Sequence, residues 1–197
     1  MQGIMFVELS GFVEELLGPR AWKETLVEAG LDDRAYTVDA AAPDDEFLAL
    51  VTSAATRSGR ELQSVLEGFG EYLAPHLLGE YGTLVDPGWD LLDFLEHTEV
   101  AIHMVVRERD PRSRPPRLRV VRPLPDQILV LYESPRRMCS VAKGIIRGAA
   151  RHYDQEIVIS EPRCMLAGST RCEITVRSPS PDGVPVVGVT TARSECR

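Results

Sequence analysis

Apolar residues recur at helical spacing through the first half of the chain. Between residues 3 and 17 they follow one another at intervals close to 3.6 residues, and Gly18-Pro19 ends the repeat. The same spacing predicts a third helix capped by Asp44 or Asp45 and a separate short helical piece after Pro75. Three other helices are predicted in this way: a second over about residues 20–29, a fourth that begins near Leu62, and one over about residues 89–108.

The pattern changes after a proline-rich break at residues 110–116. Runs of β-branched and large apolar residues then predict two strands that form a hairpin, a helix and two further strands. These segments cover about residues 118–121, 128–131, 135–152, 156–160 and 171–176. The order predicts an α+β fold, in which an N-terminal helical subdomain is followed by a C-terminal subdomain with a four-stranded antiparallel sheet and a helix.

Composition narrows the function classes. Ser, Pro, Gly and Thr dominate from residue 178 onward, so we expect one domain over residues 1–177 and a flexible tail over residues 178–197. The net charge of −8 disfavours nucleic acid as the main partner, because phosphate binding needs clustered Lys and Arg. We expect neither a membrane span nor a secretory leader. Four cysteines in 197 residues are no disulfide scaffold, which favours a cytoplasmic location.

The first candidate for chemistry is His103, late in the helix predicted over residues 89–108. A neutral imidazole ligates a metal through one ring nitrogen. A histidine beside an apolar helix face is also typical of a hydrogen-bonded core residue, so His103 alone decides nothing. His97 is the competing ligand on the same helix, but six residues of helix turn it to a different direction.

The second candidate is the motif Tyr132-x-Ser134-x-Arg136 at the end of a predicted strand. If the extended conformation persists, two hydroxyls and a guanidinium project to one side and can hold carboxylates. The start of the next helix would add a positive dipole there. The alternative is that Ser134 is the N-cap of that helix, with Pro135 at its first position and Arg136 in solvent.

Together, the histidine and the motif resemble the H-NOX family, the haem nitric oxide/oxygen-binding domains, over roughly residues 1–177. The resemblance includes the eleven residues between His103 and Pro115-Pro116, the hairpin, and then the Tyr-x-Ser-x-Arg motif. It also includes Met1-x-Gly3, Trp22 with Ala29-Gly30, and the turn Cys164-Met165-x-x-Gly168.

The resemblance implies a haem b between the two subdomains. His103 would be the proximal ligand of its iron, and Pro115 would press on the porphyrin. The propionates would be bound by Tyr132, Ser134 and Arg136. Nothing in the sequence is typical of an enzyme, because neither a catalytic triad, a catalytic carboxylate pair nor a phosphate loop is present.

The resemblance also implies a choice of gas. Family members that bind oxygen place a tyrosine nine residues beyond the motif tyrosine, and that position is Val141 here. The other positions that match the distal wall are also apolar: Met5, Leu9, Leu73 and Leu77. A sensor of NO and CO without a stable oxygen complex is therefore expected. In the family NO weakens the iron–histidine bond, and the signal passes to a separate effector, often a histidine kinase or a diguanylate cyclase.

Two departures from the family pattern stand out. One residue more than usual separates Phe94 from His103, and an extra residue rotates a helix by about 100°. Where some members carry a zinc or redox site, Cys164 and Cys172 match two ligands, while Glu161 and Gly168 replace a histidine and a cysteine. We therefore expect no zinc; the two cysteines are small buried hydrophobes or a reversible disulfide. The alternative function is a haem-free relative that acts as a thiol redox sensor or an interaction module.

Overall fold

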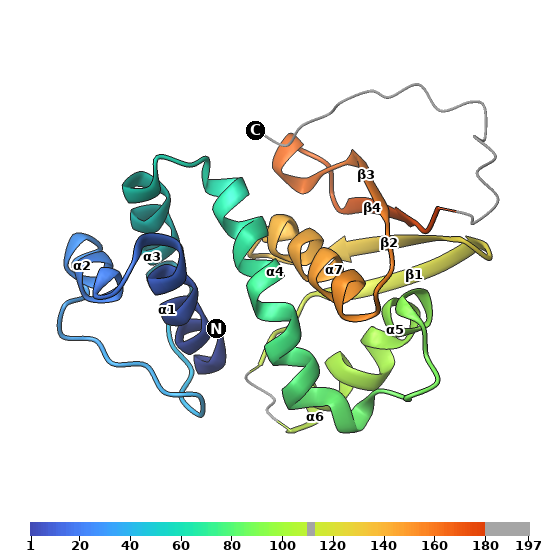
Figure 1. Cartoon of the computed structure of the whole chain (residues 1–197), viewed down its shortest axis with the longest axis horizontal. Coiled ribbons are helices and arrows are strands. Elements are labelled where there is room, and N and C mark those ends of the chain that lie inside the picture. The colour runs from blue at the N-terminus through green and yellow to red at the C-terminus, as the bar shows by residue number, and fades with distance from the viewer. Residues whose placement is uncertain (110–112, 180–197) are drawn as a thin grey trace.

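The computed structural model describes residues 1–109 and 113–179, in which helices pack against one small sheet (Figure 1). The tail expected from residue 178 onward lies almost entirely outside the described residues. The main elements are α1 (Gly3–Leu17), α2 (Ala21–Glu28), α3 (Asp44–Ser58), α4 (Leu62–Tyr81), α5 (Leu91–Thr98), α6 (Met104–Arg109), β1 (Arg117–Leu124), β2 (Gln127–Glu133), α7 (Cys139–His152), β3 (Val158–Arg163) and β4 (Cys172–Arg177). The fold class is α+β, as the sequence predicts.

The first four helices enclose an apolar core. Its largest side chains, Phe6, Phe47 and Phe69, are fully buried, and the rings of Phe6 and Phe47 meet edge to face with centroids 5.5 Å apart. The bounds of α1, α2 and α3 confirm the helical spacing. The predicted cap of α3 is wrong, because Pro43 occupies the N-cap position without a side-chain cap. Asp44 is the first helical residue, and its carboxylate bonds to groups outside the helix.

Helix α4 continues through Pro75, where the sequence predicts a break. A proline inside a helix removes a backbone hydrogen bond and costs about 3 kcal/mol. The compensation is close packing between α4 and α7, which glycines allow. A Cβ atom on Gly144 would lie 2.0 Å from the carbonyl oxygen of Glu67, and one on Gly70 would lie 2.2 Å from that of Val141. The two helices thus form one rigid layer between the helical core and the sheet (Figure 1).

The predicted helix over residues 89–108 contains a π-helical turn. It consists of α5, the π turn Glu99–His103 and α6. A π turn closes its hydrogen bonds over one more residue than an α turn, and such turns are frequent at functional sites. Such a turn accommodates one extra residue without ending the helix, which is the accommodation that the departure expected before His103 calls for.

The sheet has the strand order β1-β2-β4-β3, and each neighbouring pair is antiparallel. Helix α7 covers it and begins at Cys139, four residues later than predicted. Ser134 is therefore not the N-cap of α7, and its capping alternative is wrong. The residues between β2 and α7 form a turn instead, in which the hydroxyl of Ser134 accepts a hydrogen bond from the backbone N–H of Arg136 (3.3 Å).

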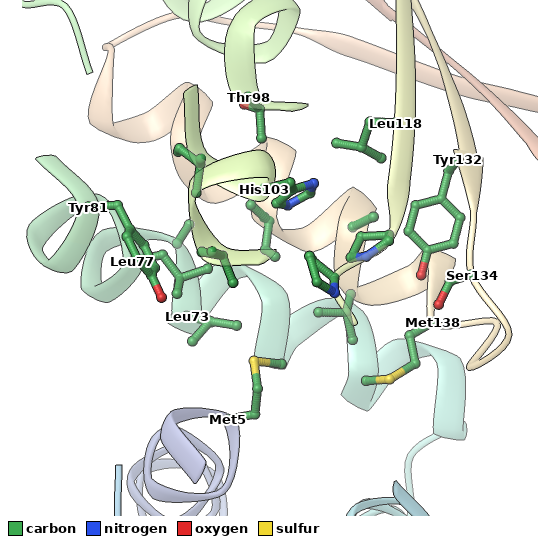
Figure 2. A pocket seen from close by; sticks show the side chains of 18 of the residues that line it. Met5, Leu73, Leu77, Tyr81, Thr98, His103, Leu118, Tyr132, Ser134 and Met138 are labelled. Carbon is green, nitrogen blue, oxygen red and sulfur yellow. The ribbon is translucent and has the colours of Figure 1, made fainter. Parts of the chain in front are cut away.

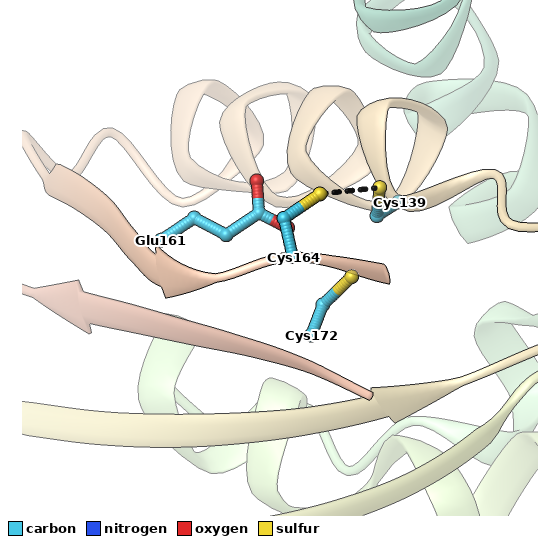
Figure 3. A group of neighbouring side chains, drawn as sticks. All are labelled: Cys139, Glu161, Cys164 and Cys172. Atoms are coloured by element: carbon cyan, nitrogen blue, oxygen red, sulfur yellow. Dashed lines mark hydrogen bonds between the residues drawn. The ribbon is translucent and has the colours of Figure 1, made fainter. Parts of the chain in front are cut away.

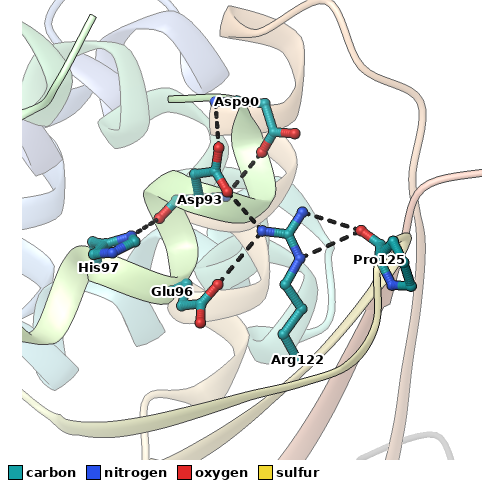
Figure 4. A network of polar contacts seen from close by, with 6 residues as sticks. All are labelled: Asp90, Asp93, Glu96, His97, Arg122 and Pro125. Carbon is teal, nitrogen blue, oxygen red and sulfur yellow. Dashed lines mark hydrogen bonds and ion pairs between the residues drawn. The ribbon is translucent and has the colours of Figure 1, made fainter. Parts of the chain in front are cut away.

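A polar network fastens the β1–β2 hairpin to α5 (Figure 4). Arg122 of β1 donates to the carboxylate of Asp93 (2.6 Å) and, at the hairpin turn, to the carbonyl oxygen of Pro125. Asp90 and Asp93 form a reciprocal capping box that starts α5. These contacts fix the position of the β1–β2 hairpin, which leads to Tyr132, relative to the helix that carries His103. Among the described residues, no helix is both long and apolar enough to cross a bilayer.

Candidate haem site and a cysteine cluster

An apolar cavity of about 230 Å³ lies between the helical core and the sheet. Its walls come from α1, α4, the π turn, β1, β2 and α7. His103 lies on one side of the cavity, Met5 and Leu73 lie opposite, and Tyr132 and Ser134 stand together at one end (Figure 2). The lining also includes Leu77, Pro115, Arg136 and Val141. Nine of the ten residues singled out from the sequence thus meet around one space.

The tenth residue, Leu9, lies elsewhere. It is fully buried in the core of the first four helices and does not line the cavity. Met5 and Leu9 are four residues apart on α1, but only Met5, nearer the start of the helix, reaches the cavity. The competing ligand His97 also lies outside the cavity. Its ring stacks on Trp89 with centroids 4.6 Å apart, and its Nδ1 is 2.8 Å from the carbonyl oxygen of Asp93.

The imidazole of His103 is oriented by a carboxylate. Its Nδ1 lies 3.1 Å from Oε2 of Glu99, at the other end of the π turn. Burial alone would raise the pKa of Glu99, but hydrogen bonds from His103, from the backbone N–H of Leu118 and from Arg107 outweigh burial and lower the pKa. Glu99 is consequently ionised at neutral pH. Sequence reasoning gave Glu99 no role, although its place four residues before His103 was a usable signal.

The motif residues supply the polar end of the cavity. Burial raises the pKa of Tyr132 to about 12, so its hydroxyl stays a protonated donor at neutral pH. Arg136 donates through Nε to Oδ2 of Asp44 (2.7 Å) and through a terminal nitrogen to the carbonyl oxygen of Arg114 (2.5 Å). Asp44 also binds the amino group of Met1 (2.8 Å). The sequence did not predict this pairing of Asp44 with Arg136, because the two residues lie 92 positions apart.

The donor set fits a haem. An imidazole nitrogen suits iron, hydroxyl and guanidinium donors suit propionates, and the remaining walls are predominantly apolar, as a porphyrin face requires. The extended conformation predicted for the whole motif ends with β2 at Glu133. A turn between β2 and α7 then brings Ser134 and Arg136 to the same cavity as Tyr132. The helix dipole contributes less than expected, because α7 starts three residues after Arg136.

A second group of reactive side chains lies between the start of α7 and strands β3 and β4 (Figure 3). Candidate ligand atoms of Cys139, Glu161, Cys164 and Cys172 all lie within 4.8 Å of one another, and the sulfurs of Cys139 and Cys164 are 3.7 Å apart. The expected disulfide between Cys164 and Cys172 is not formed, because Cys172 is a free thiol, as is Cys139, whereas Cys164 is disulfide-bonded elsewhere. The sulfur of Cys172 accepts a hydrogen bond from the backbone N–H of Met165 (3.2 Å).

The composition of this cysteine cluster differs from the expectation. Cys139 at the start of α7 supplies a third sulfur, whereas Gly168, expected at a ligand position, forms the turn before β4 with a positive φ of 90°. Lys143 forms an ion pair with Glu161 (3.0 Å), and burial raises the pKa values of the Cys139 and Cys172 thiols. A metal ion would have to displace the thiol protons and the lysine. That zinc is not bound therefore stays a prediction.

Comparisons with known proteins agree with the geometry. A family model described as Haem-NO-binding matches residues 2–161. A crystal structure of an H-NOX protein from Shewanella oneidensis in the Fe(II)NO state is 30% identical, with a TM-score of 0.84 over 91% of this chain and 100% of the other. An NMR structure of an H-NOX domain from the same organism in the Fe(II)CO state is 29% identical, with a TM-score of 0.82 over 91% and 99%.

More distant structures have the same fold. The unliganded Fe(II) H-NOX protein from K. algicida is 20% identical, with a TM-score of 0.79 over 91% of this chain and 97% of the other. No curated protein matches the chain significantly.

Proposed function

This chain belongs to the haem-NO-binding family, whose H-NOX members are haem-binding gas sensors rather than enzymes, and on this premise we propose that it is a sensor of NO and CO. It binds haem b in the cavity between the helical core and the sheet. Ferrous haem would supply the chemistry, because its iron binds small diatomic gases. The observation that carries the proposal is the position of His103, with its Nδ1 already bonded to Glu99, on the wall of an apolar cavity.

His103 would be the proximal ligand of the haem and would offer Nε2 to the iron. A carboxylate only accepts hydrogen bonds, so the bond to Glu99 places the proton on Nδ1 and the lone pair on Nε2. Pro115 lines the same cavity and is the residue that presses on the porphyrin. The hydroxyls of Tyr132 and Ser134 and the guanidinium of Arg136 hold the propionates at the polar end of the cavity.

The distal wall determines which gases bind stably. Bound dioxygen carries partial negative charge and gains from a nearby hydrogen-bond donor. The cavity residues Met5, Leu73, Leu77 and Val141 carry no N–H or O–H group on their side chains. The hydroxyl-bearing Tyr81 lies beside Leu77 in the same lining (Figure 2), but it already takes part in another interaction. NO and CO need no such donor, so we propose selectivity for these gases over oxygen. The ferrous protein in air tests this point: a stable oxygen complex in its absorption spectrum would contradict an apolar distal wall.

The output passes to a separate cytoplasmic effector, such as a histidine kinase or a diguanylate cyclase. The described residues form a single haem-NO-binding fold, whose H-NOX members are sensors, so an output activity would lie in another protein. The π turn Glu99–His103 is the segment through which a change at the iron would reach α5 and α6. The domain that does this covers residues 1–177.

The test is the Soret absorption of the purified protein after reconstitution with haem under reducing conditions. We expect a strong band in the wild type and its loss, or a shift to that of unligated haem, in His103→Gly. The matched control is His97→Gly, which removes a histidine from the same helix and should leave the band unchanged. A wild type without a band, or a His103→Gly spectrum identical to the wild type, would overturn the proposal.

One observation supports a second function. Three cysteine sulfurs gather between the start of α7 and strands β3 and β4, and those of Cys139 and Cys164 are 3.7 Å apart. Cys139 and Cys172 are free thiols and Cys164 is disulfide-bonded, so a haem-free thiol redox sensor of the same fold is the alternative. It predicts no Soret band and a reversible change in thiol count on oxidation. The haem sensor is favoured, because the cavity collects an imidazole and a carboxylate-binding end that a thiol sensor does not need.

A further inference from the structure

Glu99 occupies an unusual place for a glutamate. It begins the π turn that ends at His103, and its Oε2 lies 3.1 Å from Nδ1 of that histidine. Both side chains are largely buried, with 22% of Glu99 and 17% of His103 exposed. This is an ion-pair geometry in a partly dry environment, where hydrogen bonds to a charged group are strong.

The carboxylate of Glu99 is itself fixed by two groups besides His103. The backbone N–H of Leu118, on β1, donates to the same Oε2 at 3.0 Å, and Arg107, on α6, pairs with the other oxygen. The π turn, α6 and β1 therefore meet at one carboxylate. A glutamate held in this way cannot follow the imidazole if the ring moves, so its position defines the preferred position of the ring.

We propose that Glu99 is the positioning residue of the haem ligand: it fixes the tautomer and direction of the His103 ring and strengthens the bond between Nε2 and iron. This inference rests on the proposed function. A carboxylate that accepts from the distal nitrogen of a ligating histidine increases the basicity of the ligand, and losing such a partner typically weakens metal binding by 10- to 100-fold. Glu99 consequently opposes release of His103 from the iron when NO binds.

The first experiment measures the iron–histidine bond directly. In haem-reconstituted ferrous protein, the iron–histidine stretching band in the resonance Raman spectrum should move to lower frequency in Glu99→Gln, which keeps the side-chain length but removes the charge. With NO, the same variant should contain a larger fraction of five-coordinate haem than the wild type. The matched control is Glu96→Gln, three residues away, whose carboxylate pairs with Arg122 and does not contact His103.

The second experiment separates the hydrogen bond from a general effect on folding. In His103→Gly, free imidazole can replace the missing ring and donate to Glu99, whereas N-methylimidazole lacks the N–H. We expect imidazole to bind the haem of His103→Gly roughly 10-fold more tightly than that of the double variant with Glu99→Gln. N-methylimidazole should bind both equally.

The outcomes distinguish this inference from the proposed function. A wild type without a histidine-ligated haem removes both. A wild type with such a haem, but with the same stretching frequency and the same NO coordination in Glu99→Gln, overturns the positioning role of Glu99 and leaves the gas sensor intact. Equal affinities of imidazole in the single and double His103→Gly variants would also overturn it.

Discussion

The candidate haem cavity and the cysteine cluster both border α7 but differ in the protonation and hydrogen bonding of their polar groups. In the cavity, His103 already has its Nδ1 bonded to an ionised Glu99, so one nitrogen is left for a metal. In the cluster, burial raises the pKa values of the Cys139 and Cys172 thiols, and Lys143 occupies the one carboxylate. The cavity therefore favours the form of His103 that can ligate a metal, whereas the cluster favours protonated thiols, which cannot.

Helix α7 is the wall that the two regions share, so the largest expected effect comes from displacing it. Gly144→Ala adds only a Cβ atom, but that atom would lie 2.0 Å from the carbonyl oxygen of Glu67 on α4. We expect the free energy of unfolding to fall by about 3 kcal/mol, together with weaker haem retention and faster thiol modification. Urea denaturation measures the first effect.

The matched control is Gly79→Ala on α4, where an added Cβ atom meets nothing within 4 Å. There the helix should gain about 0.5–1 kcal/mol, because alanine loses less backbone entropy than glycine. If both variants changed stability in the same direction, the contact between α4 and α7 would not be the constraint that we infer.

The comparison also explains what the sequence could predict. The residues of the cavity form a recognisable pattern, because His103, Pro115 and the motif from Tyr132 to Arg136 follow one another at characteristic spacings. The helix and strand order followed from periodicity alone. The sequence predicted that Cys164 and Cys172 lie close together, but it did not predict Cys139 as their neighbour. Cys139 lies 25 residues before Cys164, and only the packing of α7 on the sheet brings the two sulfurs together.

The errors have similar physical causes. The break at Pro75 was wrong because tertiary packing along α7 outweighs one lost hydrogen bond. The capping roles of Asp44 and Ser134 were wrong because long-range or turn hydrogen bonds claim both side chains. Leu9 was assigned to the cavity by sequence position alone, but it lies one turn farther along α1 than Met5, and its side chain is buried in the core of the first four helices.

The next prediction tests the apolar character of the cavity. Val141→Tyr places a hydroxyl in the distal wall, and a hydrogen bond to a charged acceptor contributes about 1.5–3 kcal/mol. We expect oxygen affinity of the ferrous haem protein to rise roughly 10-fold or more, to a stable complex visible in the absorption spectrum. Val141→Phe has nearly the same size without the hydroxyl and should gain no oxygen complex. An oxygen complex in both variants would mean that cavity shape, not the missing donor, controls the gas.

A smaller effect concerns the ion pair of Asp44 with Arg136 at the polar end of the cavity. Burial acts to raise the pKa of Asp44, but hydrogen bonds from Arg136 and from the amino group of Met1 outweigh it and lower the pKa. A lowered folded-state pKa stabilises the protein above the unfolded value of about 3.9, and this contribution is lost as the pH falls through the folded-state pKa. Because the carboxylate is 46% exposed, the contribution is about 1 kcal/mol or less.

Urea denaturation of the haem-free protein between pH 3 and pH 7 measures this contribution. Asp44→Asn should lower the free energy of unfolding at pH 7 and flatten its decline in acid, while Asp45→Asn, the neighbouring carboxylate, should leave both unchanged. Equal acid profiles for the wild type and Asp44→Asn would show that the pair does not link the helical core to the sheet subdomain energetically.

The smallest expected effect is on thiol chemistry, and it decides between the two functions. Burial raises the pKa values of Cys139 and Cys172, and only a thiolate reacts readily with an alkylating reagent. Mass spectrometry should therefore find slow modification of both at pH 7, a rate that rises steadily with pH, and rapid modification in urea. A redox sensor needs the opposite, a reactive thiolate at neutral pH. Fast alkylation of folded protein at pH 7 would erase the electrostatic contrast between the cavity and the cysteine cluster and favour the thiol sensor over the haem sensor.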